Sequence, residues 1–284
     1  MNRWVILAIL FVARTGLGIQ FQTVGSVSDH IALEFAISFT KVGTLIGLFM
    51  LPGLVLSLPT GYVGRFASDR TLVCFGLACL AIGGALVAAG NSFALAAIGR
   101  LICGAGFVFG TVFFAKMVTD WFAGKEIATA MGVLVVSWPF GIATGQIGHS
   151  WLAEAFHWHM AFYAASLFCV AGLLLVLLIY QPPADTPVNG PGQRSQLSRR
   201  EFGLVSLAAM VWAAFNAAYI VYLSFVPRLL GQGGFSPIEA AAIASLASWA
   251  LIISGPLCGH AADRSGRPDT ILYICLSVAV GALL

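Results

Sequence analysis

Eight apolar runs, each about 20 residues long, constrain this chain of 284 residues more than any other feature. A helix needs roughly 20 apolar residues to cross a hydrocarbon core of about 30 Å. A ninth run begins near Thr270 and reaches Leu284, about 15 residues later, so we predict that the chain is truncated inside its ninth transmembrane helix. The pattern predicts an all-α membrane protein, with spans at 4–27, 42–63, 72–90, 93–114, 129–152, 160–180, 202–225 and 240–260.

The composition excludes an ordinary soluble domain. The chain is 60% hydrophobic and 9% charged, whereas soluble domains carry about 25% charged residues. The first run differs from a cleavable signal peptide, because it is longer than the usual apolar core and carries Arg14 in its middle. We therefore interpret it as the first span.

The loop charges predict the orientation, since Lys and Arg accumulate in cytoplasmic loops. With the N-terminus inside, the cytoplasmic segments hold ten basic residues and the opposite side holds two, Lys41 and Arg228. We expect a multi-pass protein of the cell membrane, a bacterial inner membrane, with a cytoplasmic N-terminus. The net charge of +3 then reflects topology and does not indicate a nucleic-acid partner.

One long polar stretch interrupts the short loops and suggests a division of the chain. Residues 181–200 contain four prolines and end in a cluster of arginines. Such a segment cannot bury enough apolar surface to fold alone, which is typical of a linker. We predict a six-helix bundle at 1–180, a cytoplasmic linker at 181–201 and an incomplete C-terminal bundle at 202–284.

Three sequence motifs carry a family resemblance. The fourth span contains RLICGAG, starting at Arg100, and the fifth contains Pro139 with several glycines. The loop after the eighth span reads GHAADRSGRP and fits the pattern G-x-x-x-D-[RK]-x-G-[RK]. Together these motifs resemble the major facilitator superfamily. With an arginine inside its first span, the chain resembles in particular the anion-handling branches of that superfamily, for cyanate-like and monocarboxylate substrates. The resemblance implies two six-helix halves around a central cavity, and a gating role for Gly259, Asp263, Arg264, Gly266 and Arg267.

The pseudo-symmetry of that fold places this loop beside the inner end of the fifth span. We therefore expect Asp263 to lie within hydrogen-bonding reach of the first turn of that span, since a carboxylate is stabilised at a helix N-terminus. Arg264 or Arg267 can add an ion pair to Glu126 or Asp120.

The corresponding loop of the first half departs from that pattern. It reads GYVGRFASDR, so Arg65 stands where the pattern has aspartate and Ser68 where it has the later glycine. The acidic residue of this loop, Asp69, stands four residues after the position of the pattern's aspartate. We expect the first half to gate differently from the second, through Gly61, Gly64, Arg65 and Arg70.

Two arginines lie inside the predicted spans, and no acidic residue does. Intramembrane charges usually face a water-filled path or a partner, so this imbalance indicates a cavity that attracts anions. Arg14 is about 15 Å along the first span, and Gly18 and Phe21 follow on nearly the same face. We predict that Arg14 binds substrate and that Gly18 and Phe21 leave room for the ligand beside it. The alternative is an arginine tied to carbonyls of a neighbouring helix. Arg100 has two interpretations of equal weight: a structural motif that packs the fourth span, or a substrate or proton role.

The seventh span contributes Asn216 near mid-depth and Tyr219 one turn further out, as substrate-binding candidates, as packing residues or as part of the interfacial belt. None of the five histidines is predicted at mid-depth, and no CxxC pair occurs among the six cysteines. We therefore predict no metal site, no cofactor and no evident proton relay in the visible spans.

The sequence favours a secondary transporter that moves a small anion, most simply an organic monoanion, by alternating access. Its partners are then the anion and the bilayer, with the coupling ion left open. The alternative is a proton-coupled exporter of hydrophobic or cationic compounds, a class that typically needs a membrane-embedded acid. An enzyme would need a nucleophile and base, or a metal cluster, at one depth, and we predict none.

Overall fold

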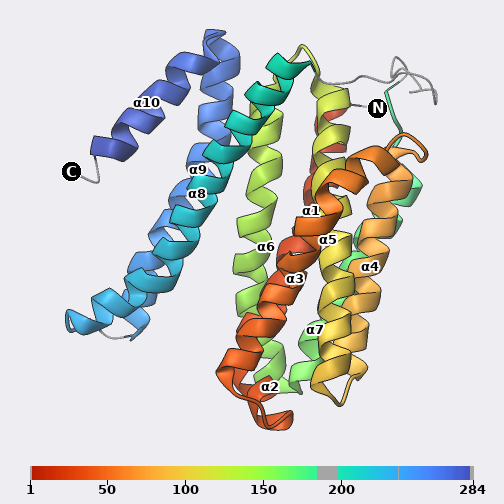
Figure 1. Cartoon of the computed structure of the whole chain (residues 1–284), viewed down its shortest axis with the longest axis vertical. Coiled ribbons are helices and arrows are strands. Elements are labelled where there is room, and N and C mark those ends of the chain that lie inside the picture. The colour runs from red at the N-terminus through yellow and green to blue at the C-terminus, as the bar shows by residue number, and fades with distance from the viewer. Residues whose placement is uncertain (1, 184–197, 236, 282–284) are drawn as a thin grey trace. The chain divides into compact units, whose positions relative to one another are not determined.

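A computed structural model of the chain describes residues 2–183, 198–235 and 237–281, and all regular elements in these ranges are helices (Figure 1). Seven of the described helices are long and apolar enough to span a membrane. The all-α prediction is confirmed, and the chain is a multi-pass membrane protein. The helices are α1 (Arg3–Ser26), α2 (Ser28–Glu34), α3 (Phe39–Val63), α4 (Asp69–Ala89), α5 (Phe93–Phe122), α6 (Ile127–Ala155), α7 (Trp158–Ile179), α8 (Arg199–Gln232), α9 (Pro237–Ser265) and α10 (Pro268–Gly281).

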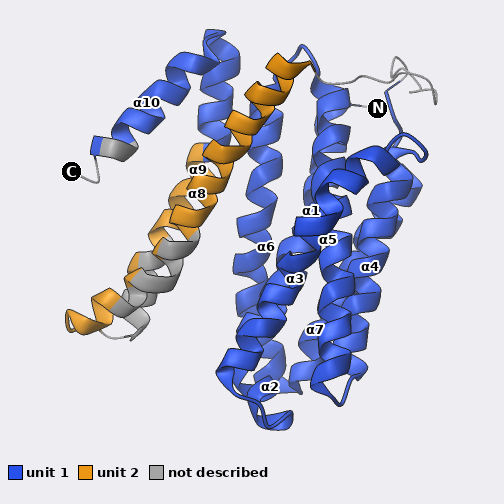
Figure 2. Ribbon diagram, viewed as in Figure 1, with its two compact units in different colours: residues 1–188, 255–284 blue, residues 189–254 orange. Residues whose placement is uncertain are grey.

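The chain divides into two units, formed by residues 1–188 with 255–284 and by residues 189–254 (Figure 2). Most of the predicted linker lies outside the described residues, and the predicted three-part division stays a prediction. Within the first unit, α1 contacts α6 and α7, and α4 contacts α5 and α7. α3 packs on α5.

The helix starts follow from local sequence. Ser68 accepts a hydrogen bond from the backbone N–H of Thr71 at the start of α4, and Ser92 accepts one from Leu95 at the start of α5. Such N-caps satisfy amides that lack a partner within the helix. α6 is different, because its N-cap residue Glu126 provides no side-chain cap and has a left-handed backbone conformation with φ of 56°.

The interior of the first unit is apolar and closely packed. Its buried residues include Leu10 and Leu17 of α1, Leu77 of α4 and Phe114 of α5. One short helix, α2, was not predicted from the sequence. It has only seven residues, too few for a hydrophobic periodicity to be distinguished from a loop.

Candidate functional site

Arg14 lies inside the first unit, where α1 meets α6. Its side chain is 9% exposed, and Nη1 donates to the carbonyl oxygen of Leu134 at 2.7 Å and to Ser137 Oγ at 2.8 Å. Nε is buried and has no hydrogen-bond partner among the described residues. No carboxylate of the described part of the chain pairs with this guanidinium. Arg14 is therefore a buried cation with an unused donor.

Gly18 brings α1 and α6 into close contact next to Arg14. A Cβ atom at Gly18 would lie 2.5 Å from the carbonyl oxygen of Trp138, and one at Gly141 would lie 2.3 Å from that of Thr15. Only glycine fits at these two positions, because any larger residue would force the helices apart. We expected Gly18 to leave room for a ligand beside Arg14, but the backbone of α6 fills the space next to Gly18.

Phe21 belongs to a ring of four aromatic side chains from four different helices. The ring centroids lie 5.4 Å apart for Phe21 and Phe49, 5.3 Å for Phe49 and Phe107, 4.9 Å for Phe107 and Trp138, and 5.2 Å for Trp138 and Phe21. Phe49 is buried, and the other three are half-buried. Trp138 follows Ser137 directly, so this aromatic cluster lies close to the contacts of Arg14. The cluster was missed in the sequence, since its members are spread over α1, α3, α5 and α6.

Arg100 is fully buried and has backbone partners on two neighbouring helices. Nε donates to Leu45 O of α3 at 3.1 Å, and Nη1 and Nη2 donate to the carbonyl oxygens of Gln20 and Phe21 of α1 at 3.0 and 3.3 Å. The guanidinium carbon also lies 4.5 Å from the ring centre of Phe49. These acceptors hold the Arg100 side chain inside the bundle of the first unit, away from lipid. A substrate role for it stays a prediction.

Asn216 and Tyr219 lie on α8, in the second unit. The Asn216 side chain donates to the carbonyl oxygen of Trp212 one turn earlier, at 2.8 Å, and the ring of Tyr219 stacks on Phe215. Their predicted role in substrate binding is not tested by these contacts.

Asp263 contacts the first turn of α6, as we predicted from the sequence. Oδ1 accepts a hydrogen bond from the backbone N–H of Ala128 at 3.1 Å. Oδ2 accepts from the N–H and the Oγ1 hydroxyl of Thr129, both at 2.6 Å. Gly259 permits this approach, since a Cβ there would lie 2.3 Å from the carbonyl oxygen of Ala128. Asp263 thus supplies the cap that Glu126 does not provide.

Glu126 forms an ion pair with a residue of α1. Its carboxylate pairs with Arg3 at 2.5 Å, and Asp120 pairs with Lys116 at 3.1 Å. The ion pairs expected from Arg264 or Arg267 to these two acids do not occur among the described residues, because each acid has another basic partner. Arg264 and Arg267 are exposed, and Gly266 ends α9 with φ of 62°, a conformation that favours glycine.

The remaining gating candidates lie around the α3–α4 loop. Gly61 is in the last turn of α3 with open space around it, and Gly64 follows that helix close to Phe113. Arg65 is exposed and lies over the ring of Tyr62 at 5.3 Å. Arg70 donates to the carbonyl oxygen of Leu177 in α7. Their role in gating stays a prediction.

The comparison with known families identifies the chain. The sequence model of the family described as Major Facilitator Superfamily matches residues 6–284 of this chain. The chain belongs to the major facilitator superfamily. The family membership predicted from the sequence motifs is confirmed, while the anion-handling branch and the truncation stay predictions.

Relatives of this major facilitator protein are distant in sequence. The chain is 24% identical to AraJ of Escherichia coli (strain K12), covering 95% of this chain and 68% of AraJ. It is also 24% identical to the lysosomal dipeptide transporter MFSD1 of Danio rerio, covering 96% of this chain and 64% of MFSD1. Among solved structures, a peptide transporter POT mutant in complex with alafosfalin matches with a TM-score of 0.57 and 12% identity, over 78% of this chain and 48% of that one. The chain thus spans about two thirds of the length of the curated relatives and about half of that of the solved structure.

Proposed function

We propose that this protein acts as a secondary transporter that moves a small organic monoanion across the membrane by alternating access. The observation that carries the proposal is the Arg14 guanidinium, which is buried, has no acidic partner among the described residues and keeps Nε unpaired. A charge without a counterion inside a membrane domain is costly unless a ligand or water compensates it. Its carbonyl partners on α6 compensate it only in part.

The chemistry of the surroundings favours a carboxylate with an apolar body. The planar guanidinium can bond two oxygens of one carboxylate side by side, through a pair of N–H groups that includes Nε. The half-buried rings of Phe21, Phe107 and Trp138 offer apolar contact nearby. A dipeptide, the substrate in the name of MFSD1, also carries a carboxylate that a guanidinium can bind, but its ammonium group makes it a zwitterion.

The second candidate is a proton-coupled exporter of hydrophobic or cationic compounds. The aromatic cluster supports it, because aromatic faces attract cations. A choline/ethanolamine transporter, FLVCR2 of Homo sapiens, is 24% identical over 69% of this chain. Two observations weigh against a cationic substrate: Arg14 would repel it, and Arg100 already occupies a face of Phe49.

We also propose that Asp263 holds the inner gate, in a bacterial inner membrane with a cytoplasmic N-terminus. The positive-inside bias places the first turn of α6 at the cytoplasm. The contact between Asp263 and that turn would then stabilise the state in which the cytoplasmic side is closed. Breaking it should favour the inward-open state.

The test of the substrate class is uptake of labelled monocarboxylates and choline by the protein reconstituted into liposomes. We expect saturable uptake of a monocarboxylate that Arg14→Ala abolishes and Arg14→Lys reduces at least about tenfold, since lysine presents a point charge. Arg3→Lys is the matched control, because it changes the same chemistry at the exposed start of the same helix. Normal saturation kinetics in Arg14→Ala would refute the proposal, and uptake of choline alone would favour the alternative.

A further inference from the structure

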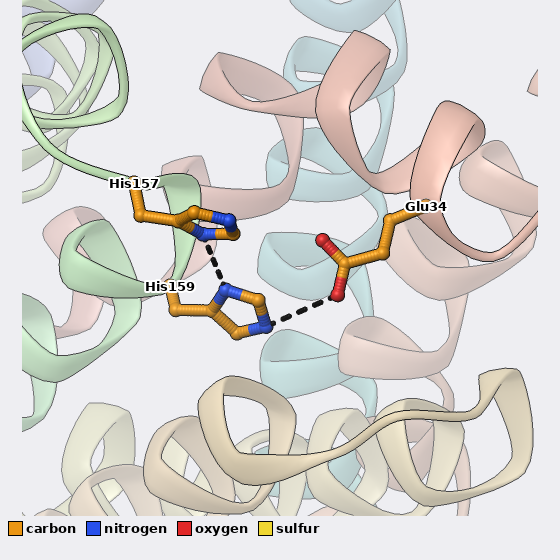
Figure 3. Close-up of side chains that lie close together, drawn as sticks. All are labelled: Glu34, His157 and His159. Carbon is orange, nitrogen blue, oxygen red and sulfur yellow. Dashed lines mark hydrogen bonds and ion pairs between the residues drawn. The ribbon is translucent and has the colours of Figure 1, made fainter.

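Three side chains with metal-ligating atoms converge at the α2 end of the first unit (Figure 3). Glu34 ends α2, and His157 and His159 flank the first residue of α7. One ligand atom from each residue lies within 4.8 Å of the other two. The acid and the histidines are more than 120 residues apart in the sequence, which is why their spacing predicted no metal site.

The distances are close to those of a metal site. Zinc binds imidazole nitrogen at about 2.0–2.1 Å and carboxylate oxygen at about 2.0–2.2 Å, so two ligand atoms of a tetrahedral site are about 3.3 Å apart. His159 Nε2 and Glu34 Oε1 are 3.4 Å apart. The ring of His157 is exposed, and its Nδ1 lies 2.6 Å from His159 Nδ1. The exposed His157 ring must therefore turn for one of its nitrogens to reach the third ligand position beside Glu34.

The two histidines also have lone pairs available for a metal. Their Nδ1 atoms face each other, so one ring donates a proton and the other accepts it. Each neutral imidazole has one nitrogen lone pair, and each ring can therefore ligate through one nitrogen. When His159 ligates through Nε2 beside Glu34, its Nδ1 keeps the proton, and His157 becomes a ligand once its own lone pair leaves the contact with that Nδ1.

Trp158 holds this cluster in position. Its indole N–H donates to the second carboxylate oxygen of Glu34 at 2.6 Å, and its ring stacks on His159 with centroids 3.8 Å apart. Metal-ligating carboxylates are usually oriented by such a hydrogen bond from a neighbouring residue. Trp158 is itself buried, so it fixes both ligands from within the bundle.

We propose that Glu34, His157 and His159 form a binding site for Zn²⁺. Two imidazoles and one carboxylate are a ligand set that zinc accepts, with water in the fourth position. The site joins α2 to α7 and would stiffen this end of the bundle. In the proposed orientation it faces the outside of the cell, but the binding itself does not depend on the transport function.

The test is isothermal titration of the purified protein in detergent with Zn²⁺ at pH 7.5. We expect one Zn²⁺ per chain, and at least about a hundredfold weaker binding in Glu34→Gln and in His157→Gln, because each loses a ligand. Trp158→Phe keeps the ring and loses the hydrogen bond to Glu34, so a loss of about tenfold is expected. His260→Asn, which removes an exposed histidine of α9, is the matched control and should bind as the wild type does.

A second measurement addresses the geometry. Co²⁺ bound in the same site should give visible absorption bands of a tetrahedral complex, and Zn²⁺ should displace them. Glu34→Gln and His157→Gln that elute as monodisperse peaks but show no such bands would support the site. Wild-type protein without a saturable Zn²⁺ isotherm, or ligand variants that bind as tightly as wild type, would overturn it.

Discussion

The segments 61–70 and 259–268 are related in sequence, but their acidic residues make different contacts. In the second segment, Asp263 caps the first turn of α6 through three hydrogen bonds. In the first segment, Arg65 replaces the corresponding acid and lies over Tyr62, while the later Asp69 pairs with Lys116 of α5. A displacement of four residues thus changes a carboxylate from a helix cap into one member of an ion pair. The difference suggests that only the second segment holds α6.

The largest effect is expected for Asp263→Ala. Loss of an N-cap destabilises a helix end by about 1 kcal/mol and by up to about 2 kcal/mol, which corresponds to a local opening about 5- to 30-fold more frequent. Hydrogen–deuterium exchange of the Ala128 and Thr129 amides should accelerate by that factor. Asp269→Asn, which removes an exposed acid from the neighbouring first turn of α10, is the control. Unchanged exchange in Asp263→Ala would show that the cap is not stabilising.

A smaller effect is expected from pH. Asp263 lies beyond the predicted eighth span. Burial raises the pKa of its carboxyl, but the hydrogen bonds from Thr129 and Ala128 outweigh burial and hold the pKa below its usual value. The capped state therefore has the lower pKa, so the contact is fully present above the ordinary value of about 4 and is lost as pH falls through the depressed pKa.

Wild type and Asp263→Asn provide the measurement. Their difference in exchange at Ala128 and Thr129 should be constant from pH 7 to pH 5 and should shrink below about pH 4, because the protonated carboxyl and the amide are both neutral. A difference that disappears already between pH 7 and pH 6 would show that the Asp263 carboxyl is not the group responsible.

The smallest effect is expected for Asp69→Asn. Lys116 keeps Asp120 as a partner at 3.1 Å, and partly exposed ion pairs contribute about 0–1 kcal/mol. The melting temperature of the protein and the exchange of the α6 amides should both stay close to wild type. If Asp69→Asn opened α6 as strongly as Asp263→Ala, the two segments would have equivalent roles and the comparison would fail.

Sequence reasoning was most successful where one segment decides the outcome. The long apolar runs predicted the seven described helices that can span a membrane, whereas α9, predicted as the eighth span, is not among those seven. The position of Asp263 six spans after the first loop predicted its contact with the first turn of α6. It was less successful where acceptors come from the backbone. Every amino acid carries a carbonyl, so the partners of Arg100 at Gln20, Phe21 and Leu45 have no signature in the sequence.

Contacts between distant side chains were also missed. The aromatic cluster contains one residue from each of four helices, and the cluster of Glu34, His157 and His159 joins the end of α2 to the start of α7. Neither set has a regular spacing. Only the packing of the helices brings its members together.

The contacts of α6 suggest how a ligand bound near Arg14 could affect the first turn of α6, which Asp263 contacts. Asp263 contacts α6 at Thr129, and Arg14 contacts it at Leu134, which is five residues or about 7.5 Å further along the same helix. At Gly18 and Gly141 the backbones of α1 and α6 are in close contact, which leaves the two helices no room to slide independently. A ligand that draws Arg14 away from Leu134 would therefore act on the helix whose first turn Asp263 holds, without a separate relay of side chains.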